Sequence, residues 1–419
     1  MTMIEFKRKH YLDLLIRRKH NHMIKIITGL RRSGKSYLLN TLFKNHLLSD
    51  GVDEQHIISL ALDDFDNHQY LDPKALSQYV KDQIKDSNMY YLLLDEIQLV
   101  DQFEFVLNGF LYKSNLDVYV TGSNSRFLVN DVITEFRGRG DEVRVYPLSI
   151  AELHEAFPDK SWDDLWSEYS YFGGLPQTVL MNDTAQKSQY LKQLFQTTYF
   201  KDIIDRYHIQ QVESFGQLAD FVASAIGSLT NPHKLSNTFS SNGLKISDDT
   251  IKQYLNYLQD AFLISEAKRY DIRGKQYIGS PYKYYFTDIG LRNALLNFRQ
   301  YEETHLMENI IYIELLRRKY VVDVGMVEVI EQVNGKREHK RLEIDFVANR
   351  GSERYYIQSA FAMPSEEKIQ QEGRPLLKVK DSFKKIIVVK EPIIHRHNEN
   401  GVLIISLKQF LFDENSLML

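Results

Sequence analysis

The sequence predicts an α/β fold whose amino-terminal part is a parallel β-sheet with crossover helices. Short apolar strands alternate with helical stretches between residues 23 and 122. The expected strands cover residues 23–28, 56–62, 90–94 and 118–121. Strands separated by helices pair in parallel, because each helix carries the chain back to the start of the next strand. A glycine-bearing turn joins the first strand to a helix that begins near Lys35.

The composition is that of an ordinary globular protein. Of the 419 residues, 43% are hydrophobic and 26% are charged, which is enough for a sizeable core. The net charge is −4, so any surface that binds nucleic acid or membrane has to be local. There is no cysteine, which excludes disulfides, thiolate zinc sites and a cysteine nucleophile. Without a secretory signal or an apolar run long enough to span a membrane, we expect a cytoplasmic protein with no membrane partner.

A phosphate-binding loop is the most specific motif. Residues 29–36, GLRRSGKS, match G-x-x-x-x-G-K-[ST] between a buried strand and a helix. Lys35 would supply a charge to the β- and γ-phosphates, Ser36 would hold magnesium, and the helix amino terminus would attract the anion. The flanking strand and helix disfavour a chance match. The predicted nucleotide-binding residues are Gly29, Leu30, Arg31, Arg32, Ser33, Gly34, Lys35, Ser36 and Tyr37.

Polar residues follow two of the later strands. The strand at 90–94 ends in Asp95 and Glu96. We expect Asp95 to hold magnesium through water and Glu96 to polarise the attacking water, the alternative being two ordinary acids at a solvated strand end. The next strand runs into Ser123 and Asn124, where an amide or hydroxyl would sense the γ-phosphate unless this is a simple turn. Small-molecule kinases rarely combine these features, so ATP hydrolysis is expected.

Several motifs together resemble the predicted AAA+ ATPases of bacteria and archaea. They are MIKIITGLRRSGKSYLL at 23–39, LLLDEIQ at 92–98, TGSNS at 121–125, RGR at 137–139, PLSI at 147–150 and FGGLP at 172–176. Members of that family carry a carboxyl-terminal domain of unknown function with a restriction-endonuclease-like core. The resemblance covers nearly the whole chain.

The resemblance implies an AAA+-type sheet, and it adds roles to the candidate residues. It places Lys35, Ser36, Asp95 and Glu96 at the nucleotide, with Asn124 or Ser123 as the first sensor. It also implies that Arg137 or Arg139 is an arginine finger, which neutralises charge in the transition state; the alternative is a surface salt bridge. A finger that acts on a neighbouring subunit would require a homo-oligomer.

Four domains are expected from the pattern and the resemblance. They are a P-loop ATPase domain at 1–148, a helical lid at 149–210, a winged-helix domain at 211–295 and a restriction-endonuclease-like α/β domain at 296–419.

The winged-helix prediction depends on two helices and a hairpin. Ser247 is a good N-cap for the second helix, with Asp248 and Asp249 in its first turn. The hairpin that follows is basic, and its candidate nucleic-acid-binding residues are Lys268, Arg269, Arg273 and Lys275. A basic wing with interleaved tyrosines suits a phosphate backbone. The two aspartates would repel DNA phosphates at the start of the recognition helix. The alternative is therefore a winged helix that packs within the protein or contacts another protein.

The last domain has the spacing of a metal-dependent nuclease but lacks part of the chemistry. Glu308, Asp345 and Gln358 follow the order acid, aspartate, (D/E)-x-K. Gln358 replaces the second-strand acid, and Ala360 stands at the lysine position. Two carboxylates are a poor site for magnesium, so we expect a degenerate site that does not cut nucleic acid. Acids that merely cap an edge strand are the alternative.

The sequence thus favours an ATP-hydrolysing switch or motor that acts on nucleic acid. The expected cofactors are ATP and Mg²⁺, and the expected partner is DNA, bound by the winged helix. The alternative is an ATP-gated regulatory protein whose partner is another protein, and a third hypothesis is an ATP-regulated nuclease.

Overall fold

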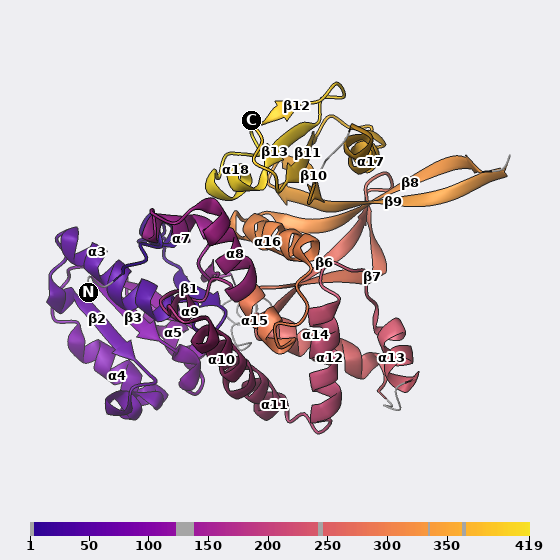
Figure 1. The fold of residues 1–419 in the computed structure, drawn as a ribbon. Coiled ribbons are helices and arrows are strands. Elements are labelled where there is room, and N and C mark those ends of the chain that lie inside the picture. Colours follow the sequence, from indigo (N-terminus) through magenta and orange to yellow (C-terminus); the bar gives the residue numbers. More distant parts are fainter. Residues whose placement is uncertain (1–3, 123–137, 242–245, 334–335, 363–365) are drawn as a thin grey trace. The chain divides into compact units, whose positions relative to one another are not determined.

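The computed structural model describes residues 4–122, 138–241, 246–333, 336–362 and 366–419 (Figure 1). The chain divides into two compact units. The first consists of Met1–Leu148, Leu175–Gln177 and Asp260–Phe262, and the second contains the remaining residues.

The first unit is built on a five-stranded parallel sheet. Its strands are β1 (Ile24–Gly29), β2 (Ile57–Ala61), β3 (Tyr90–Asp95), β4 (Leu116–Thr121) and β5 (Gly140–Val145), in the order β2-β3-β4-β1-β5. The predicted α/β class and parallel sheet are confirmed. The edge strand β5 was not predicted, because its sequence GDEVRV is mostly polar and only partly buried.

Helices cover this sheet, and each face has its own hydrophobic core. The helical segments are α1 (Lys9–Arg17), α2 (Lys35–Tyr37), which continues through η1 (Leu38–Phe43) into α3 (Lys44–Ser49), α4 (Pro73–Gln83) and α5 (Phe103–Phe110), with short turns η2 (Glu54–His56), η3 (Phe65–Leu71) and η4 (Ile97–Leu99). Ile26 and Leu92 belong to one buried cluster, and Ile27 and Leu93 to the other. Adjacent residues of a strand point to opposite faces, so β1 and β3 are buried on both sides.

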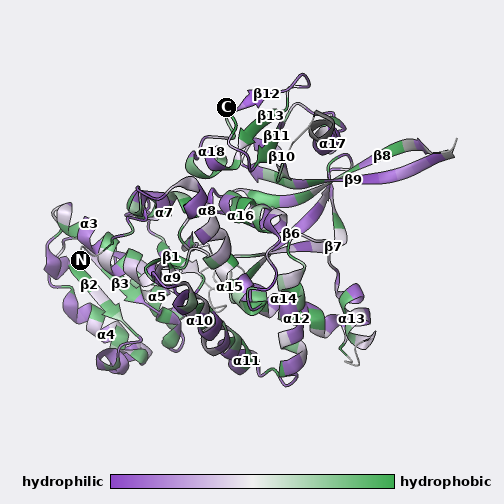
Figure 2. Ribbon diagram, in the orientation of Figure 1, coloured by the Kyte–Doolittle hydropathy of each residue, from purple (hydrophilic) through white to green (hydrophobic). Residues whose placement is uncertain are grey.

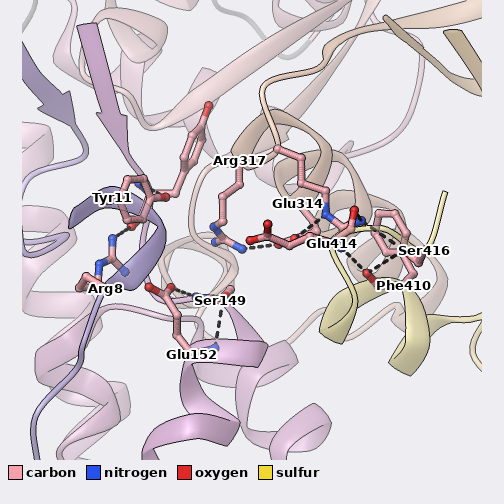
Figure 3. Close-up of polar contacts among 11 residues, drawn as sticks. Arg8, Tyr11, Ser149, Glu152, Glu314, Arg317, Phe410, Glu414 and Ser416 are labelled. Atoms are coloured by element: carbon pink, nitrogen blue, oxygen red, sulfur yellow. Dashed lines mark hydrogen bonds and ion pairs between the residues drawn. The ribbon is translucent and has the colours of Figure 1, made fainter. Parts of the chain in front are cut away.

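The second unit begins with a helical region, as the sequence predicts. The helices that lie wholly or partly in it are α7 (Ile150–Ala156), α8 (Trp162–Phe172), α9 (Pro176–Val179), α10 (Thr184–Leu194), η6 (Phe195–Phe200), α11 (Lys201–Tyr207), α12 (Val212–Ser224), α13 (Pro232–Ser241), α14 (Asp248–Asp260), α15 (Ile289–Leu295), α16 (Glu303–Arg317), α17 (Glu366–Leu377) and α18 (Leu407–Phe412). Ser149 and Glu152 form a capping box at the start of α7 (Figure 3).

A mixed eight-stranded sheet forms the rest of the second unit. Its strands are β6 (Ile264–Asp271), β7 (Gln276–Phe286), β8 (Val321–Val333), β9 (Lys336–Arg350), β10 (Glu353–Ala360), β11 (Lys384–Val389), β12 (Arg396–His397) and β13 (Leu403–Ser406), in the order β12-β13-β11-β10-β9-β8-β6-β7. The hairpin β6–β7 joins this sheet because Arg269 on β6 pairs in parallel with Val324 on β8. The sheet is therefore continuous across residue 296, where we placed a domain boundary, and the division into four domains stays a prediction.

The two ends of this sheet differ in polarity. Strands β11 and β13 are buried and hydrophobic, whereas β8 and β9 continue beyond their neighbours as a two-stranded arm that is largely hydrophilic along β9 (Figures 1 and 2). Helix α16 is held to the carboxyl-terminal segment by Arg318, which donates to Glu314 at 2.9 Å and to the Ser416 hydroxyl at 3.2 Å. Figure 3 shows the neighbouring ion pair of Glu314 with Arg317.

Candidate nucleotide site

The phosphate-binding loop begins at Gly29, the last residue of β1. Any larger residue at this position would force the neighbouring backbone to move. Gly29 has a φ of +132°, and a Cβ at this position would lie 2.1 Å from the carbonyl oxygen of Val145 on β5. Gly34, at the other end of the loop, has a φ of +94°. Side chains other than glycine rarely adopt such angles. The two glycines therefore define where the loop turns toward the helix that begins at Lys35.

Lys35 is a buried cation at the centre of the loop. Its side chain is only 4% exposed, and Nζ donates to the carbonyl oxygens of Gly29 at 3.2 Å and Leu30 at 3.1 Å. Burial lowers the pKa of Lys35 to about 8, although the carboxylates of Glu96 and Asp95 oppose this shift. A buried ammonium whose neighbours include loop carbonyls is well placed to receive an anion such as a phosphate.

The other predicted loop residues differ in environment. Ser33 is fully buried, and its hydroxyl has no hydrogen-bond partner within the part of the chain that the structure describes. Leu30 is buried in the core, whereas Arg31 and Arg32 are exposed. The Tyr37 hydroxyl donates to Glu5 at 3.4 Å. Ser33 is therefore the residue whose polar group most clearly lacks a protein partner.

Asp95 lies at the carboxyl end of β3, beside the loop. Its buried carboxylate accepts hydrogen bonds from the hydroxyls of Thr121 and Ser36 and from the Asn40 amide at 3.3 Å. Burial raises the pKa of Asp95, while the Thr121 and Ser36 hydrogen bonds oppose that rise. The structure thus brings together Ser36 and Asp95, the two predicted magnesium ligands, and both present the hard oxygen atoms that this ion prefers.

Glu96 follows in an unusual backbone conformation. Its φ is +55°, which is uncommon for a residue other than glycine. The backbone N–H of Glu96 donates to the Thr121 hydroxyl at 2.9 Å, and its carboxylate accepts from the Gln98 amide. The unusual φ directs the Glu96 side chain differently from a continuing strand, and such conformations are common at functional sites.

Sequence reasoning assigned no role to Thr121, which the structure places between the two acids. Thr121 ends β4, and its hydroxyl contacts both Asp95 and Glu96 on the neighbouring strand. The sequence signal for this role is a hydroxyl residue at the end of β4, the strand that pairs with the one ending in Asp95. Ser123 and Asn124, which we predicted as sensors, lie outside the described residues, as does Arg137.

The structure places Arg139 at the amino-terminal end of the strands, whereas the phosphate-binding loop leaves β1 at its carboxyl end. Its carbonyl oxygen accepts a hydrogen bond from the N–H of Ile24, the first residue of β1, and its side chain is exposed. Gly29, where the loop begins, is five residues further along β1, which corresponds to roughly 17 Å of strand. Arg139 is therefore distant from the nucleotide site of its own chain.

Of the four candidate nucleic-acid-binding residues in the hairpin, three are exposed and one is already engaged. Lys268, Arg273 and Lys275 are exposed. Arg269 is only 8% exposed, and its guanidinium donates to the carbonyl oxygens of Gly279 at 2.9 Å and Ser280 at 3.1 Å. Contrary to our expectation, Arg269 therefore stabilises the hairpin and does not face solvent.

The three nuclease-like residues lie close together in the second unit. The Asp345 N–H donates to the Gln358 side-chain oxygen at 3.4 Å, and the Asp345 and Glu308 carboxylates lie 3.9 and 2.9 Å from Lys283 Nζ. Sequence reasoning did not connect Lys283 with these acids. With the side chains in their observed positions, no group of three or more histidine, aspartate or glutamate residues among the described residues could hold a metal ion.

Comparison with known proteins identifies an AAA domain over the residues that include the phosphate-binding loop. Residues 21–154 match an AAA domain, and residues 163–302 match a domain of unknown function (DUF8612). An uncharacterized protein of Haemophilus influenzae is 35% identical over 393 residues, covering 93% of this chain and 94% of its own. The chain belongs to the family of that protein. An uncharacterized protein of Methanocaldococcus jannaschii is 26% identical over 339 residues, covering 77% of this chain and 71% of its own.

A solved structure agrees at the level of the fold. The Walker-type ATPase of Pyrococcus abyssi has a TM-score of 0.50 and 16% identity, covering 70% of this chain and 96% of its own. The predicted resemblance is thus confirmed for an AAA domain with a P-loop. In the part of the chain that the structure describes, no helix has the length and apolar character needed to cross a membrane.

Proposed function

We propose that this protein hydrolyses ATP with magnesium at the site formed by Lys35, Ser36, Asp95 and Glu96. The observation that carries the proposal is the hydrogen-bonded link from Asp95 through the Thr121 hydroxyl to the Glu96 backbone. This link fixes the proposed metal-binding carboxylate and the candidate base next to each other, and both carboxylates act on the buried Lys35 ammonium.

The residues at the loop fit a magnesium ion. The Ser36 hydroxyl and the Asp95 carboxylate would hold it, the carboxylate through water, since Mg²⁺ commonly keeps several waters. Bound there, magnesium supplies positive charge to the phosphate oxygens. Lys35 adds a second positive charge. In the described residues its ammonium donates to the backbone carbonyls of Gly29 and Leu30, and a phosphate could replace these acceptors.

Glu96 is the candidate general base. Its carboxylate is partly exposed, so it can reach a water molecule. The Gln98 amide that donates to this carboxylate would hold it in one orientation. In this proposal Glu96 orients the attacking water and accepts its proton, while Asp95 stays with the metal.

We further propose that ATP turnover drives a switch or motor that acts on nucleic acid. Helices α13 and α14 followed by the hairpin β6–β7 have the layout of a winged helix. Lys268, Arg273 and Lys275 project from the hairpin into solvent, where a phosphate backbone could pair with them.

The alternative is a protein partner, and one observation favours it. Asp249 in the first turn of α14 has a side chain that is 87% exposed, and its pairing with Lys252 at 3.2 Å is at the surface. An exposed acid at the start of a recognition helix repels DNA phosphates, but a basic protein surface would accept it.

DNA binding tests these two alternatives. Arg273→Glu with Lys275→Glu should weaken binding of a labelled duplex and reduce the slope of log K against log salt by up to about two, since two phosphate contacts are lost. A matched control reverses two exposed lysines of α4, Lys74→Glu with Lys81→Glu, and should leave the slope unchanged. Equal effects of both double variants, or no DNA binding by the wild type at any salt concentration, would favour the protein partner.

A further inference from the structure

Lys283 lies inside a cluster of carboxylates in the second unit. It comes from β7 and is only 3% exposed. Its Nζ lies 2.6 Å from Glu343, 2.9 Å from Glu308 and 3.9 Å from Asp345, measured to the nearest carboxylate oxygen that pairs with it. Glu308 comes from α16. Glu343 and Asp345 are two residues apart on β9 and therefore lie on the same face of that strand. Three elements that are distant in sequence thus converge on one ammonium.

The surrounding structure fixes this arrangement. The Tyr285 hydroxyl donates to the same oxygen of Glu308 at 2.6 Å. The Phe286 N–H donates to the Asn309 side-chain oxygen at 2.7 Å, and the Asn309 amide donates to the Phe286 carbonyl oxygen at 2.8 Å. These two hydrogen bonds hold α16 against β7. A Cβ at Gly227 would come within 3.1 Å of both Glu308 carboxylate oxygens, so a glycine there leaves room for the acid.

The charges of the cluster explain why a cation is needed. Burial alone would lower the pKa of Lys283, but the three carboxylates outweigh burial and raise it, so the lysine keeps its charge. Burial and the neighbouring Glu308 raise the pKa of Asp345 to about 8. The cluster therefore contains more acid than one ammonium neutralises, and removal of Lys283 would leave the carboxylates uncompensated.

We propose that the ε-ammonium of Lys283 is the resident cation of this cluster and stands where a metal-dependent nuclease of this layout would hold a divalent ion. The two cations exclude each other. The carboxylate oxygens that accept hydrogen bonds from Lys283 are those that a metal would ligate, and a divalent ion beside a buried ammonium would be repelled. Glu308, Glu343 and Asp345 thus form with Lys283 a structural ion-pair cluster that ties α16 and β9 to the hairpin β6–β7.

Metal binding by lysine variants tests this proposal. Lys283→Met keeps a long unbranched side chain but removes the charged terminal atom, leaving Glu308, Glu343 and Asp345 for a metal. Titration with Mn²⁺ in the absence of nucleotide should show binding at least about tenfold tighter than in the wild type. Lys283→Arg keeps the cation and should show no gain, and neither should Lys268→Met, which removes an exposed lysine of the same hairpin. Adding Asp345→Asn to Lys283→Met should abolish the gain, which assigns it to the cluster.

Two results would overturn the proposal. One is stoichiometric Mn²⁺ binding by the wild type that Asp345→Asn removes, because metal and lysine would then coexist. The other is a folded Lys283→Met variant whose Mn²⁺ affinity equals that of the wild type. If Lys283→Met unfolds, the proposal predicts that millimolar Mn²⁺ restores its circular dichroism spectrum, whereas the double variant is not restored. Failure of Mn²⁺ to distinguish the two variants would contradict it. None of these outcomes depends on ATP hydrolysis.

Discussion

The Thr121 hydroxyl donates a hydrogen bond to the Asp95 carboxylate and thereby joins the carboxyl ends of β4 and β3. The same oxygen accepts the N–H of Glu96 at 2.9 Å. One small side chain thus orients both acids of the proposed ATPase site, without a role in the chemistry itself.

Removing this hydroxyl should impair turnover more than binding. Thr121→Val keeps the shape of the side chain but leaves Asp95 and the Glu96 N–H without their partner. We expect kcat for ATP to fall by roughly 10- to 100-fold, as is common when a partner of a metal ligand is lost, with a smaller change in KM. Thr121→Ser keeps the hydroxyl and should recover most of the activity. If Thr121→Val and the wild type have the same kcat, Thr121 does not position the acids.

The close approach of Gly29 to β5 predicts a large effect on stability. Gly29→Ala would place a Cβ 2.1 Å from the Val145 carbonyl oxygen, in addition to the strain of a positive φ. Gly51→Ala is a matched control, because Gly51 has a φ of +87° and no atom within 4 Å of the added Cβ. In denaturant unfolding, Gly51→Ala should cost about 1 kcal/mol, as expected from backbone strain alone. Gly29→Ala should cost clearly more and also weaken nucleotide binding. Similar losses for both variants would contradict the packing argument.

The Asp345 carboxyl predicts a dependence of stability on pH. Its pKa is raised from 3.8 to about 8 in the folded protein, so the folded state holds this proton more tightly than the unfolded state. The stabilisation is fully present below the unfolded pKa and is lost as pH rises toward 8, with a slope of at most about 1.4 kcal/mol per pH unit. Asp345→Asn, which mimics the protonated acid, should flatten the decline between pH 5 and 8. Asp249→Asn, at an exposed acid of the same unit, should leave the wild-type profile unchanged. Parallel profiles for Asp345→Asn and the wild type would remove the basis of this prediction.

The parts of the structure that follow local rules were predictable. Strands β1, β3 and β4 are buried along their whole length and read as apolar runs, and the loop between β1 and Lys35 has a specific motif. Helix α14 also follows the prediction, since the Thr250 N–H donates to the Ser247 hydroxyl at 3.1 Å. In contrast, β5 pairs along an edge through its backbone and has little apolar pattern to reveal it.

What the sequence could not show are contacts between residues that are distant along the chain. We looked for the nuclease lysine at position 360, whereas Lys283 reaches the acids from β7, 62 residues before Asp345. The sheet pairing that places β6–β7 beside β8 creates this contact, and no spacing rule encodes it. Likewise, the sequence does not distinguish Arg269 from the other cations of the wing. In the folded hairpin its guanidinium donates to the carbonyl oxygens of Gly279 and Ser280.

The most direct test of the central claim is ATP turnover by the wild type, Glu96→Gln and Lys35→Ala, measured together with nucleotide binding. The account predicts that the wild type hydrolyses ATP with magnesium and that Glu96→Gln binds ATP but turns it over at least about 100-fold more slowly, because only the base is lost. Lys35→Ala should lose nucleotide binding, turnover or both. Wild-type turnover in Lys35→Ala would contradict the assignment of the site, and normal turnover in Glu96→Gln would contradict the role of Glu96 as base.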